Sequence, residues 1–298
     1  MYDVVILGSG PAGLTAAIYC GRAKKSVMIL SGESLGGQTA EIATLENYPG
    51  WHGSGMELIK FMKTQAESFG AKIEYTSATN IDFNDDGTYS IICDNGKTID
   101  SRTVILATGA RARRLDIDGA RELFGHGVSY CATCDGFFYA GRDVLVIGGG
   151  NGALNDALYL SDVAKNVTIV YRKSEFTRAE ALLRERIATK SNIKCVYNTE
   201  LKSIAQKPDS DKLIATTTNG ETMECDGIFV AIGHEANTDY LTENIKRDEM
   251  GRLDSDDLPS GMFVAGDVKS GIQMQIATAV GTGCSAGMSA IKYLNEKD

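Results

Sequence analysis

The chain has 298 residues, of which 43% are hydrophobic and 23% charged, and its formal net charge is −9 at pH 7. This length suggests about two domains. An acidic chain repels nucleic-acid phosphates and anionic membranes, so we expect neither as a partner. No apolar run approaches the roughly 18 residues of a membrane-spanning helix, and we expect a cytoplasmic protein.

The first stretch, DVVILGSGPAGLTAAIYC, predicts a strand, a glycine turn and a helix. The apolar run at 4–7 ends at a glycine, which indicates a β-strand rather than a signal peptide. Gly8, Gly10 and Gly13 form G-x-G-x-x-G, and 27–30 is the next strand. The first glycine allows a tight turn, the second lets a pyrophosphate approach the backbone, and the third lets helix and strand pack closely.

Residues 71–110 predict an antiparallel meander, with turns at 85–87 and 95–96. After it comes CATCDGFFY, in which Cys131 and Cys134 are two residues apart. A zinc site usually needs four ligands, yet there is no second C-x-x-C pair and the three histidines are scattered. A structural disulfide is unfavourable in the cytosol, which leaves a redox pair beside a helix start, where a thiolate is stabilised.

A second copy of the first pattern follows, as DVLVIGGGNGALNDALYL. Residues 144–147 and 167–170 are its strands, and Gly148, Gly150 and Ala153 form G-x-G-x-x-A. The helix N-terminus offers free N–H groups to a phosphate. Two copies in one chain predict two dinucleotide sites.

The end of the second strand in each copy indicates which nucleotide binds. The first ends at Ser31, with Glu33 two residues later, and an acid there favours a free ribose hydroxyl, as in FAD. The second is followed by Arg172, Lys173 and Arg178, which suit the 2′-phosphate of NADPH. A solvated basic turn is the alternative.

Residues 194–233 repeat the antiparallel plan, and the chain ends in a strand, a loop and one long helix. The sequence therefore predicts an α/β fold of two Rossmann-like, three-layer nucleotide-binding domains, each with an antiparallel β insert. We expect the crossings between them near 113–115 and 237–241.

The chain resembles the low-molecular-weight thioredoxin reductases along its whole length. The matching stretches are GSGPAGLTAAIY, GGQ, ENYPG, ATGA, CATCDGFFY, GGGNGA, AIGHEANT, FVAGDV and TAVGTGC. The resemblance implies an FAD-binding domain of residues 1–114 and 245–298. Inserted in it would be a pyridine-nucleotide domain, 115–244, that carries the redox pair.

The resemblance also implies which residues hold the cofactors. FAD would contact Gly8, Gly10, Pro11, Ala12, Gly13, Ser31, Glu33, Gly37, Gln38, Asn47, Thr108, Gly109, Gly266, Asp267, Gln275 and Ile276. NADP would contact Gly148, Gly150, Asn151, Gly152, Ala153, Arg172, Lys173 and Arg178. No metal is expected.

By the same resemblance, electrons would pass from NADPH through FAD to a Cys131–Cys134 disulfide and then to a thioredoxin-like protein. Cys134 would be the sulfur nearer the flavin, Cys131 the one that attacks thioredoxin, and Asp135 the acid/base. A domain rotation about the crossings and a homodimer are expected.

Three positions depart from the family pattern. Lys173 stands where an arginine is usual and Arg178 lies one place late, although lysine lacks the planar fork of arginine. Asn155 and Asp156 replace two glutamates, and Met274 replaces an arginine. These changes leave the donor open to NADH, a deazaflavin or ferredoxin. A ferredoxin–NADP reductase of the same fold would lack the cysteine pair, and a non-enzymatic flavin-bound interaction protein would show no turnover.

Overall fold

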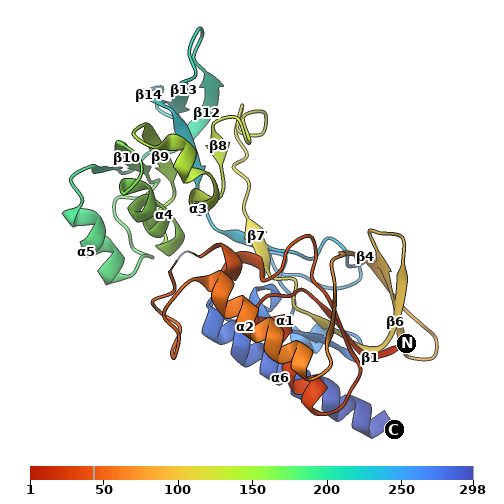
Figure 1. Ribbon diagram of the computed structural model, residues 1–298. Helices are drawn as coiled ribbons and strands as arrows, with labels where there is room; N and C mark the ends of the chain where they lie inside the picture. Colours follow the sequence, from red (N-terminus) through yellow and green to blue (C-terminus); the bar gives the residue numbers. More distant parts are fainter. Residues whose placement is uncertain (43, 298) are drawn as a thin grey trace. The chain divides into compact units, whose positions relative to one another are not determined.

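The computed structural model describes residues 1–42 and 44–297 (Figure 1). The chain forms two compact units, residues 1–111 with 235–298, and residues 112–234. We call them unit 1 and unit 2. Each contains a parallel sheet with helices on one face.

Unit 1 is built on one mixed sheet in the order β3-β2-β1-β6-β5-β4, with β17 also beside β6. Strands β3, β2, β1, β6 and β17 run parallel, and β4 and β5 add an antiparallel hairpin. The elements of its N-terminal part are β1 (Tyr2–Leu7), α1 (Pro11–Arg22), β2 (Val27–Leu30), η1 (Gly37–Glu41), α2 (Gly55–Ser68), β3 (Lys72–Glu74), β4 (Ala78–Phe83), β5 (Tyr89–Cys93) and β6 (Thr98–Leu106). Its C-terminal part holds η3 (Ser255–Asp257), β17 (Met262–Val264), η4 (Gly266–Val268) and α6 (Ile276–Lys297).

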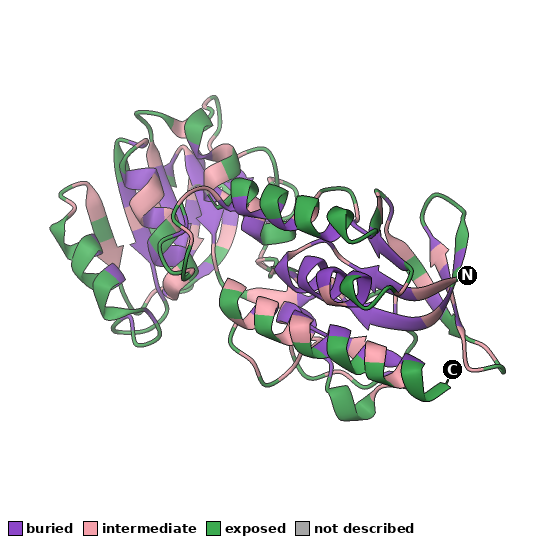
Figure 2. Ribbon diagram, turned by 60° about the horizontal axis from the view of Figure 1, so that its bottom comes forward, coloured by how far each residue is buried: buried purple, intermediate pink, exposed green. Residues whose placement is uncertain are grey.

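Alternation along β1 divides the core of unit 1 between the two faces of the sheet. Val4 and Ile6 pack with α1, α2 and α6. Val5 and Leu7 face the other way and pack with the β4–β5 hairpin and with residues of the 236–268 segment. Both faces are covered, so residues 4–7 of β1 and the whole of β2 are buried, and Figure 2 shows the buried centre of the sheet.

Unit 2 has a parallel sheet in the order β11-β10-β9-β15-β8 and a separate antiparallel sheet, β12-β13-β14. Its elements are β8 (Val128–Ser129), α3 (Ala132–Asp135), η2 (Gly136–Tyr139), β9 (Asp143–Ile147), α4 (Asn151–Ser161), β10 (Asn166–Val170), α5 (Ala181–Thr189), β11 (Ile193–Val196), β12 (Leu201–Gln206), β13 (Leu213–Thr217), β14 (Thr222–Cys225) and β15 (Gly227–Val230). Val144 and Val146 pack with α3, α4 and α5, whereas Leu145 and Ile147 pack with the antiparallel sheet. The result is the three-layer arrangement that the sequence predicts.

Two short strands, β7 (Ala110–Ala112) and β16 (His234–Ala236), pair with each other where the chain passes between the units. Arg111 on β7 donates to Glu235 at 2.8 Å and also binds Asp239. The second crossing therefore comes before the expected 244/245 boundary. The reason is burial, because Ala236, Leu241 and Ile245 pack in the core of unit 1.

The antiparallel meanders predicted from the sequence differ from the observed strands in the same way in both units. The segment expected as the first strand of each insert is split in two. Residues 72–74 and 193–196 extend the parallel sheets as edge strands β3 and β11. Only β4 and β12, which follow them, belong to the antiparallel inserts.

Candidate active site

The two motif cysteines form a disulfide, Cys131–Cys134, with a Cα–Cα distance of 5.3 Å. Cys131 caps the short helix α3, and its Sγ accepts the Cys134 N–H at 3.2 Å. The Thr133 hydroxyl also lies 3.4 Å from that sulfur. A thiolate on Cys131 would therefore have two hydrogen-bond donors in place, which favours its ionised form.

Asp135 ends α3, and its carboxylate accepts the Ser129 hydroxyl at 2.6 Å. The Ser129 oxygen also accepts the Cys131 N–H at 3.1 Å. Asp135 is the N-cap residue of η2, but its side chain makes no capping hydrogen bond there, and the side chain that caps α3 is that of Cys131. The carboxyl group is instead connected through one serine to the backbone of the redox cysteine.

Two aromatic side chains follow the motif and stay in solvent. Phe137 is 75% exposed and Phe138 is 71% exposed. Tyr139 turns inward and packs edge-on against Phe229, with ring centroids 5.3 Å apart. An apolar pair beside an accessible disulfide provides contact area for a protein substrate.

In unit 1 the glycine turn joins β1 to α1 as expected. Gly8 has φ +108°, and a Cβ there would lie 2.2 Å from the Ala107 carbonyl oxygen. A Cβ on Gly13 would lie 2.0 Å from the Gly8 oxygen. Gly10 differs, because a Cβ on it would meet nothing closer than 3.8 Å. Because Gly10 has no side chain, the backbone N–H groups at the N-terminus of α1 stay accessible, and no side chain caps this helix.

The remaining residues expected around FAD come from loops at the carboxyl ends of β1, β2, β6 and β17, all in unit 1. Ser9 accepts the Gly36 N–H at 3.1 Å, which ties the GGQ loop to the glycine turn. Gln38 donates to the Ala110 carbonyl at 2.6 Å. Asn47 donates to Gln275 at 3.1 Å, so two expected flavin contacts from distant segments meet.

Asp267 lies on η4, directly after β17. The turn is held by Thr282 of α6, whose hydroxyl accepts the Gly266 N–H at 2.9 Å. Burial raises the pKa of the Asp267 carboxyl, against the opposing charge of Arg252. Thr108 and Asn237 lock the neighbouring β6 end by reciprocal bonds of 2.6 and 3.0 Å. The open backbone at Gly10, the uncapped N-terminus of α1 and the half-buried carboxyl group of Asp267 fit a dinucleotide with a polyol chain.

Ser31 and Glu33 fall at the end of β2, but their environments differ. Ser31 is buried, and its hydroxyl donates hydrogen bonds to the carbonyl oxygens of Gly32 and Glu74. Glu33 is exposed. Of the two, Glu33 is therefore the side chain free to reach a ribose hydroxyl.

The second glycine turn repeats the first in unit 2. Gly148 has φ +144°, and a Cβ there would lie 2.2 Å from the Ala231 oxygen. Nothing lies within 4 Å of a Cβ on Gly150 or Gly152. Asn151 exchanges two hydrogen bonds with Glu180, at 2.7 and 2.8 Å. The open backbone again leaves room for a pyrophosphate.

The three cations after β10 are exposed. Arg172 lies 3.9 Å from Glu200, a weak surface pair. The neighbouring Tyr171 ring packs over Gly149, where a Cβ would come within 2.5 Å of it, and stacks with Phe176. Tyr171 thus anchors this turn in the core while Arg172 and Lys173 stay in solvent.

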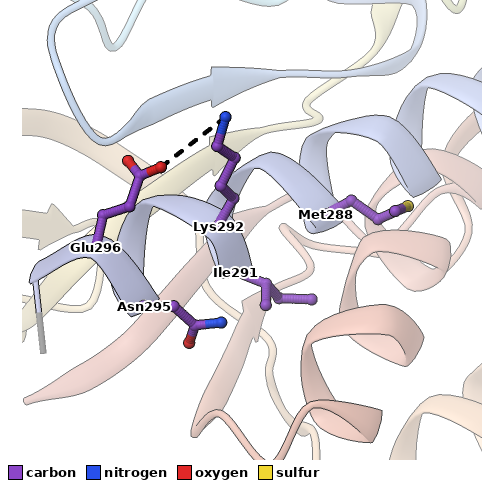
Figure 3. Close-up of a pocket in the computed structure, with 5 residues that line it drawn as sticks. All are labelled: Met288, Ile291, Lys292, Asn295 and Glu296. Atoms are coloured by element: carbon purple, nitrogen blue, oxygen red, sulfur yellow. Dashed lines mark ion pairs between the residues drawn. The ribbon is translucent and has the colours of Figure 1, made fainter.

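A surface hollow of about 370 Å³ lies elsewhere, on the C-terminal half of α6 (Figure 3). Its five lining residues all belong to that helix, and Lys292 and Glu296 form an ion pair across one side at 3.9 Å. It contains none of the expected site residues.

Four residues that support the sites were not predicted from the sequence, because each acts through a contact that only the fold creates. They are Ser9, Ser129, Asn237 and Thr282.

No helix in the described part of the chain is both long and apolar enough to cross a bilayer.

Residues 2–283 match the family model of the pyridine nucleotide-disulphide oxidoreductases. The thioredoxin reductase of Mycolicibacterium smegmatis is 36% identical, over 100% of this chain and 98% of the relative. The bifunctional thioredoxin reductase/thioredoxin of Mycobacterium leprae is 37% identical over 99% of this chain, which spans 66% of that relative's length. The crystal structure of Lactococcus lactis thioredoxin reductase has a TM-score of 0.92 and 35% identity, covering 99% of this chain and 100% of that one.

These matches confirm the fold class and the flavin-dependent disulfide oxidoreductase activity that the resemblance implies, with FAD and a pyridine nucleotide as the cofactors of the family. The chain belongs to the pyridine nucleotide-disulphide oxidoreductases and, within them, to the low-molecular-weight thioredoxin reductases.

Proposed function

We propose that this protein reduces the disulfide of a thioredoxin-like protein, using electrons from NADPH. Unit 1 would bind FAD through the residues at the carboxyl edge of its sheet, and unit 2 would bind the nucleotide at Gly148–Ala153. The observation that carries the proposal is the Cys131–Cys134 disulfide, formed on a unit with its own dinucleotide turn and flanked by two exposed aromatic rings.

FAD, held by the loops at the carboxyl edge of the unit 1 sheet, would supply the two electrons that reduce the disulfide, and NADPH would be their source. Cys134 is proposed as the sulfur nearer the flavin. Cys131 is the nucleophile, because its sulfur has the Cys134 N–H and the Thr133 hydroxyl beside it. Its thiolate attacks the substrate disulfide, a mixed disulfide forms, and the first substrate sulfur leaves as a thiolate.

Asp135 gives a proton to that leaving thiolate. Cys134 then gives its proton to the Asp135 carboxylate and attacks the Cys131 sulfur of the mixed disulfide, and that proton passes to the second substrate sulfur as it leaves. Two electrons and two protons have passed to the substrate, and Cys131–Cys134 is a disulfide again. Phe137 and Phe138 would provide the apolar contact with the partner.

Reduction of the Cys131–Cys134 disulfide by a flavin and reduction of a protein partner by the reduced pair need these cysteines in two different places. We propose that the paired strands β7 and β16 act as the hinge for the expected rotation of the units. A homodimer is proposed from the family resemblance. The five other cysteines are free thiols, which supports a reducing, cytoplasmic setting.

Anaerobic mixing tests the donor. NADPH is expected to bleach the flavin absorbance faster than NADH, while reduced ferredoxin and a reduced deazaflavin serve as the competing donors. Bleaching by ferredoxin or the deazaflavin but not by NADPH would leave the disulfide chemistry in place and overturn the donor.

Two cysteine variants test the chemistry. Cys131→Ser and Cys134→Ser should each abolish thioredoxin reduction, since neither can re-form the disulfide, while FAD stays bound. Cys284→Ser, which alters a free thiol of unit 1, is the matched control and should turn over normally. Unchanged turnover in both motif variants would remove the proposed function.

A further inference from the structure

We propose that Ser129 is a positioning residue, whose hydroxyl holds the Asp135 carboxyl in place both when that group is ionised and when it carries the proton to be delivered. This inference rests on the proposed function, because the acid/base role of Asp135 belongs to it.

Ser129 is held rigidly. It is the last residue of β8, where it pairs in parallel register with Phe229 of β15, and Val128 pairs with Ile228. Ser129 is 3% exposed, and its chain neighbour Val128 and its paired residue Phe229 are each 1% exposed. The hydroxyl therefore occupies one place at the carboxyl edge of the unit 2 sheet.

Three groups surround the Ser129 oxygen. Asp135 Oδ2 is at 2.6 Å, the Cys131 N–H donor is at 3.1 Å, and the Cys131 carbonyl oxygen is at 3.3 Å. Among the residues that the structure describes, Ser129 is the only hydrogen-bond partner of the Asp135 carboxyl group. Asp135 thus has a single anchor, and that anchor is tied to the backbone of the redox cysteine.

A hydroxyl has one proton to donate and two lone pairs to accept with, and these three neighbours use them in two ways. When Asp135 is ionised, the serine proton points to its carboxylate, a short charge-assisted bond, and the Cys131 N–H occupies one lone pair. When Asp135 is protonated, its own O–H can donate to Ser129, and the serine proton turns to the Cys131 carbonyl. Both states are satisfied without moving a heavy atom.

The consequence concerns proton transfer. Each substrate reduction takes Asp135 from protonated to ionised, and a loose carboxyl would lose the geometry that general acid catalysis requires. Other titratable groups nearby do not replace Ser129. Tyr139 lies on η2, and Asp156 and Tyr159 lie on α4, the helix packed against α3, while β15 contributes no titratable side chain.

The test measures how fast the two-electron-reduced enzyme is oxidised by thioredoxin, in single turnover and as a function of pH. Ser129→Ala should slow this step roughly 10-fold, a part of the 10²–10⁴-fold typical of a general acid, and should change the pH dependence of its rate. Ser129→Thr, which keeps the hydroxyl, should restore most of the rate. The rate of iodoacetamide alkylation of the reduced cysteines against pH provides a readout that does not depend on turnover.

Two comparisons separate a positioning role from a structural one. Ser161→Ala removes another buried hydroxyl of unit 2, one that donates to a backbone carbonyl at 2.6 Å, and should leave rate and pH profile unchanged. In an Asp135→Asn background, Ser129→Ala should add little, because the two act through one group.

Equal rates and pH profiles for Ser129→Ala and the parent enzyme, with Asp135→Asn slow, would overturn the inference and spare the proposed function. Full additivity of Ser129→Ala and Asp135→Asn would also overturn it. A parent enzyme that, once reduced, does not reduce thioredoxin would instead overturn the proposed function.

Discussion

The two units place a parallel strand at the same position of their sheets and use its end differently. In unit 1, β17 lies beside β6, and the chain leaves it into the turn that carries Asp267. In unit 2, β8 lies beside β15, and the chain leaves it into Cys131 and α3. One unit therefore presents the Asp267 carboxyl group, which we propose as a flavin contact, where the other presents the Cys131–Cys134 disulfide.

Both ends are held by a close helix contact at a glycine. A Cβ on Gly283 of α6 would lie 2.2 Å from the Ala12 oxygen of α1, and a Cβ on Gly136 would lie 3.0 Å from Tyr159 and Leu160 of α4. In each unit the residues expected to take part in the chemistry therefore lie at the carboxyl edge of the parallel sheet. Chain order hides the equivalence, because β17 comes last and β8 comes first.

The largest effect is expected from substitutions that disrupt the glycine turn present in both units. Gly8→Val and Gly148→Val should each destabilise their unit by about 3 kcal/mol or more, because the new Cβ would meet a carbonyl oxygen and the backbone has positive φ. Denaturant unfolding followed by circular dichroism measures the loss. Gly152→Ala, with open space around its Cβ, is the control and should unfold like the parent.

The next prediction separates the two nucleotide sites. Gly10→Ala and Gly150→Ala meet no protein atom closely, so the folds should persist. Gly10→Ala should weaken FAD binding roughly 10-fold or more, about 1.4 kcal/mol, and Gly150→Ala should raise the KM for NADPH while FAD stays bound. Apoprotein reconstitution and steady-state kinetics provide the two measurements. Parent-like FAD affinity in Gly10→Ala would mean that the pyrophosphate does not approach this glycine.

The cations of unit 2 have no counterpart after β2 of unit 1, where Glu33 stands. Arg172→Ala, Lys173→Ala and Arg178→Ala should each raise the KM for NADPH several-fold, to roughly 10-fold, and leave the KM for NADH nearly unchanged, because only NADPH has the 2′-phosphate. Lys202→Ala, an exposed lysine of the same unit, is the control. An unchanged KM for NADPH in all three variants would support the solvated-turn alternative.

The smallest effect concerns Asp156 of α4, one of the positions that depart from the family pattern. Burial raises its pKa from 3.8 to about 7. Between these two values the folded protein holds a proton that the unfolded chain has released, so stability falls as pH rises and the loss is complete above about 7.

Asp156→Asn removes this titration. Its Tm should exceed that of the parent by ~2–4 °C at neutral and higher pH, with the difference shrinking as the pH is lowered toward 3.8. Calorimetry across that range measures it. Asp116→Asn, an exposed carboxylate of unit 2, is the control and should show no such trend.

Local patterns predicted the strand, glycine turn and helix of each nucleotide motif, which are β1 and α1 in unit 1 and β9 and α4 in unit 2. The strand at 27–30 has the expected bounds, and 4–7, 144–147 and 167–170 lie within the observed strands. The glycine spacing also predicted the two tight turns, and nucleotide binding at them stays a prediction. The edge strands β3 and β11 were assigned to the antiparallel inserts because each is only three or four residues long and partly exposed, so its partner strand is set by packing.

The amino-acid sequence alone determined the two dinucleotide turns, the redox cysteine pair and the family, because these depend on residue types at short, regular spacing. Only the tertiary structure decided that the 235–244 segment belongs to unit 1, that β17 and β8 hold equivalent places, and that Ser129 anchors Asp135. Those results depend on which apolar faces pack together and on parallel register between strands distant in the sequence. No local pattern contains that information, since each contact exists only after the sheets have formed.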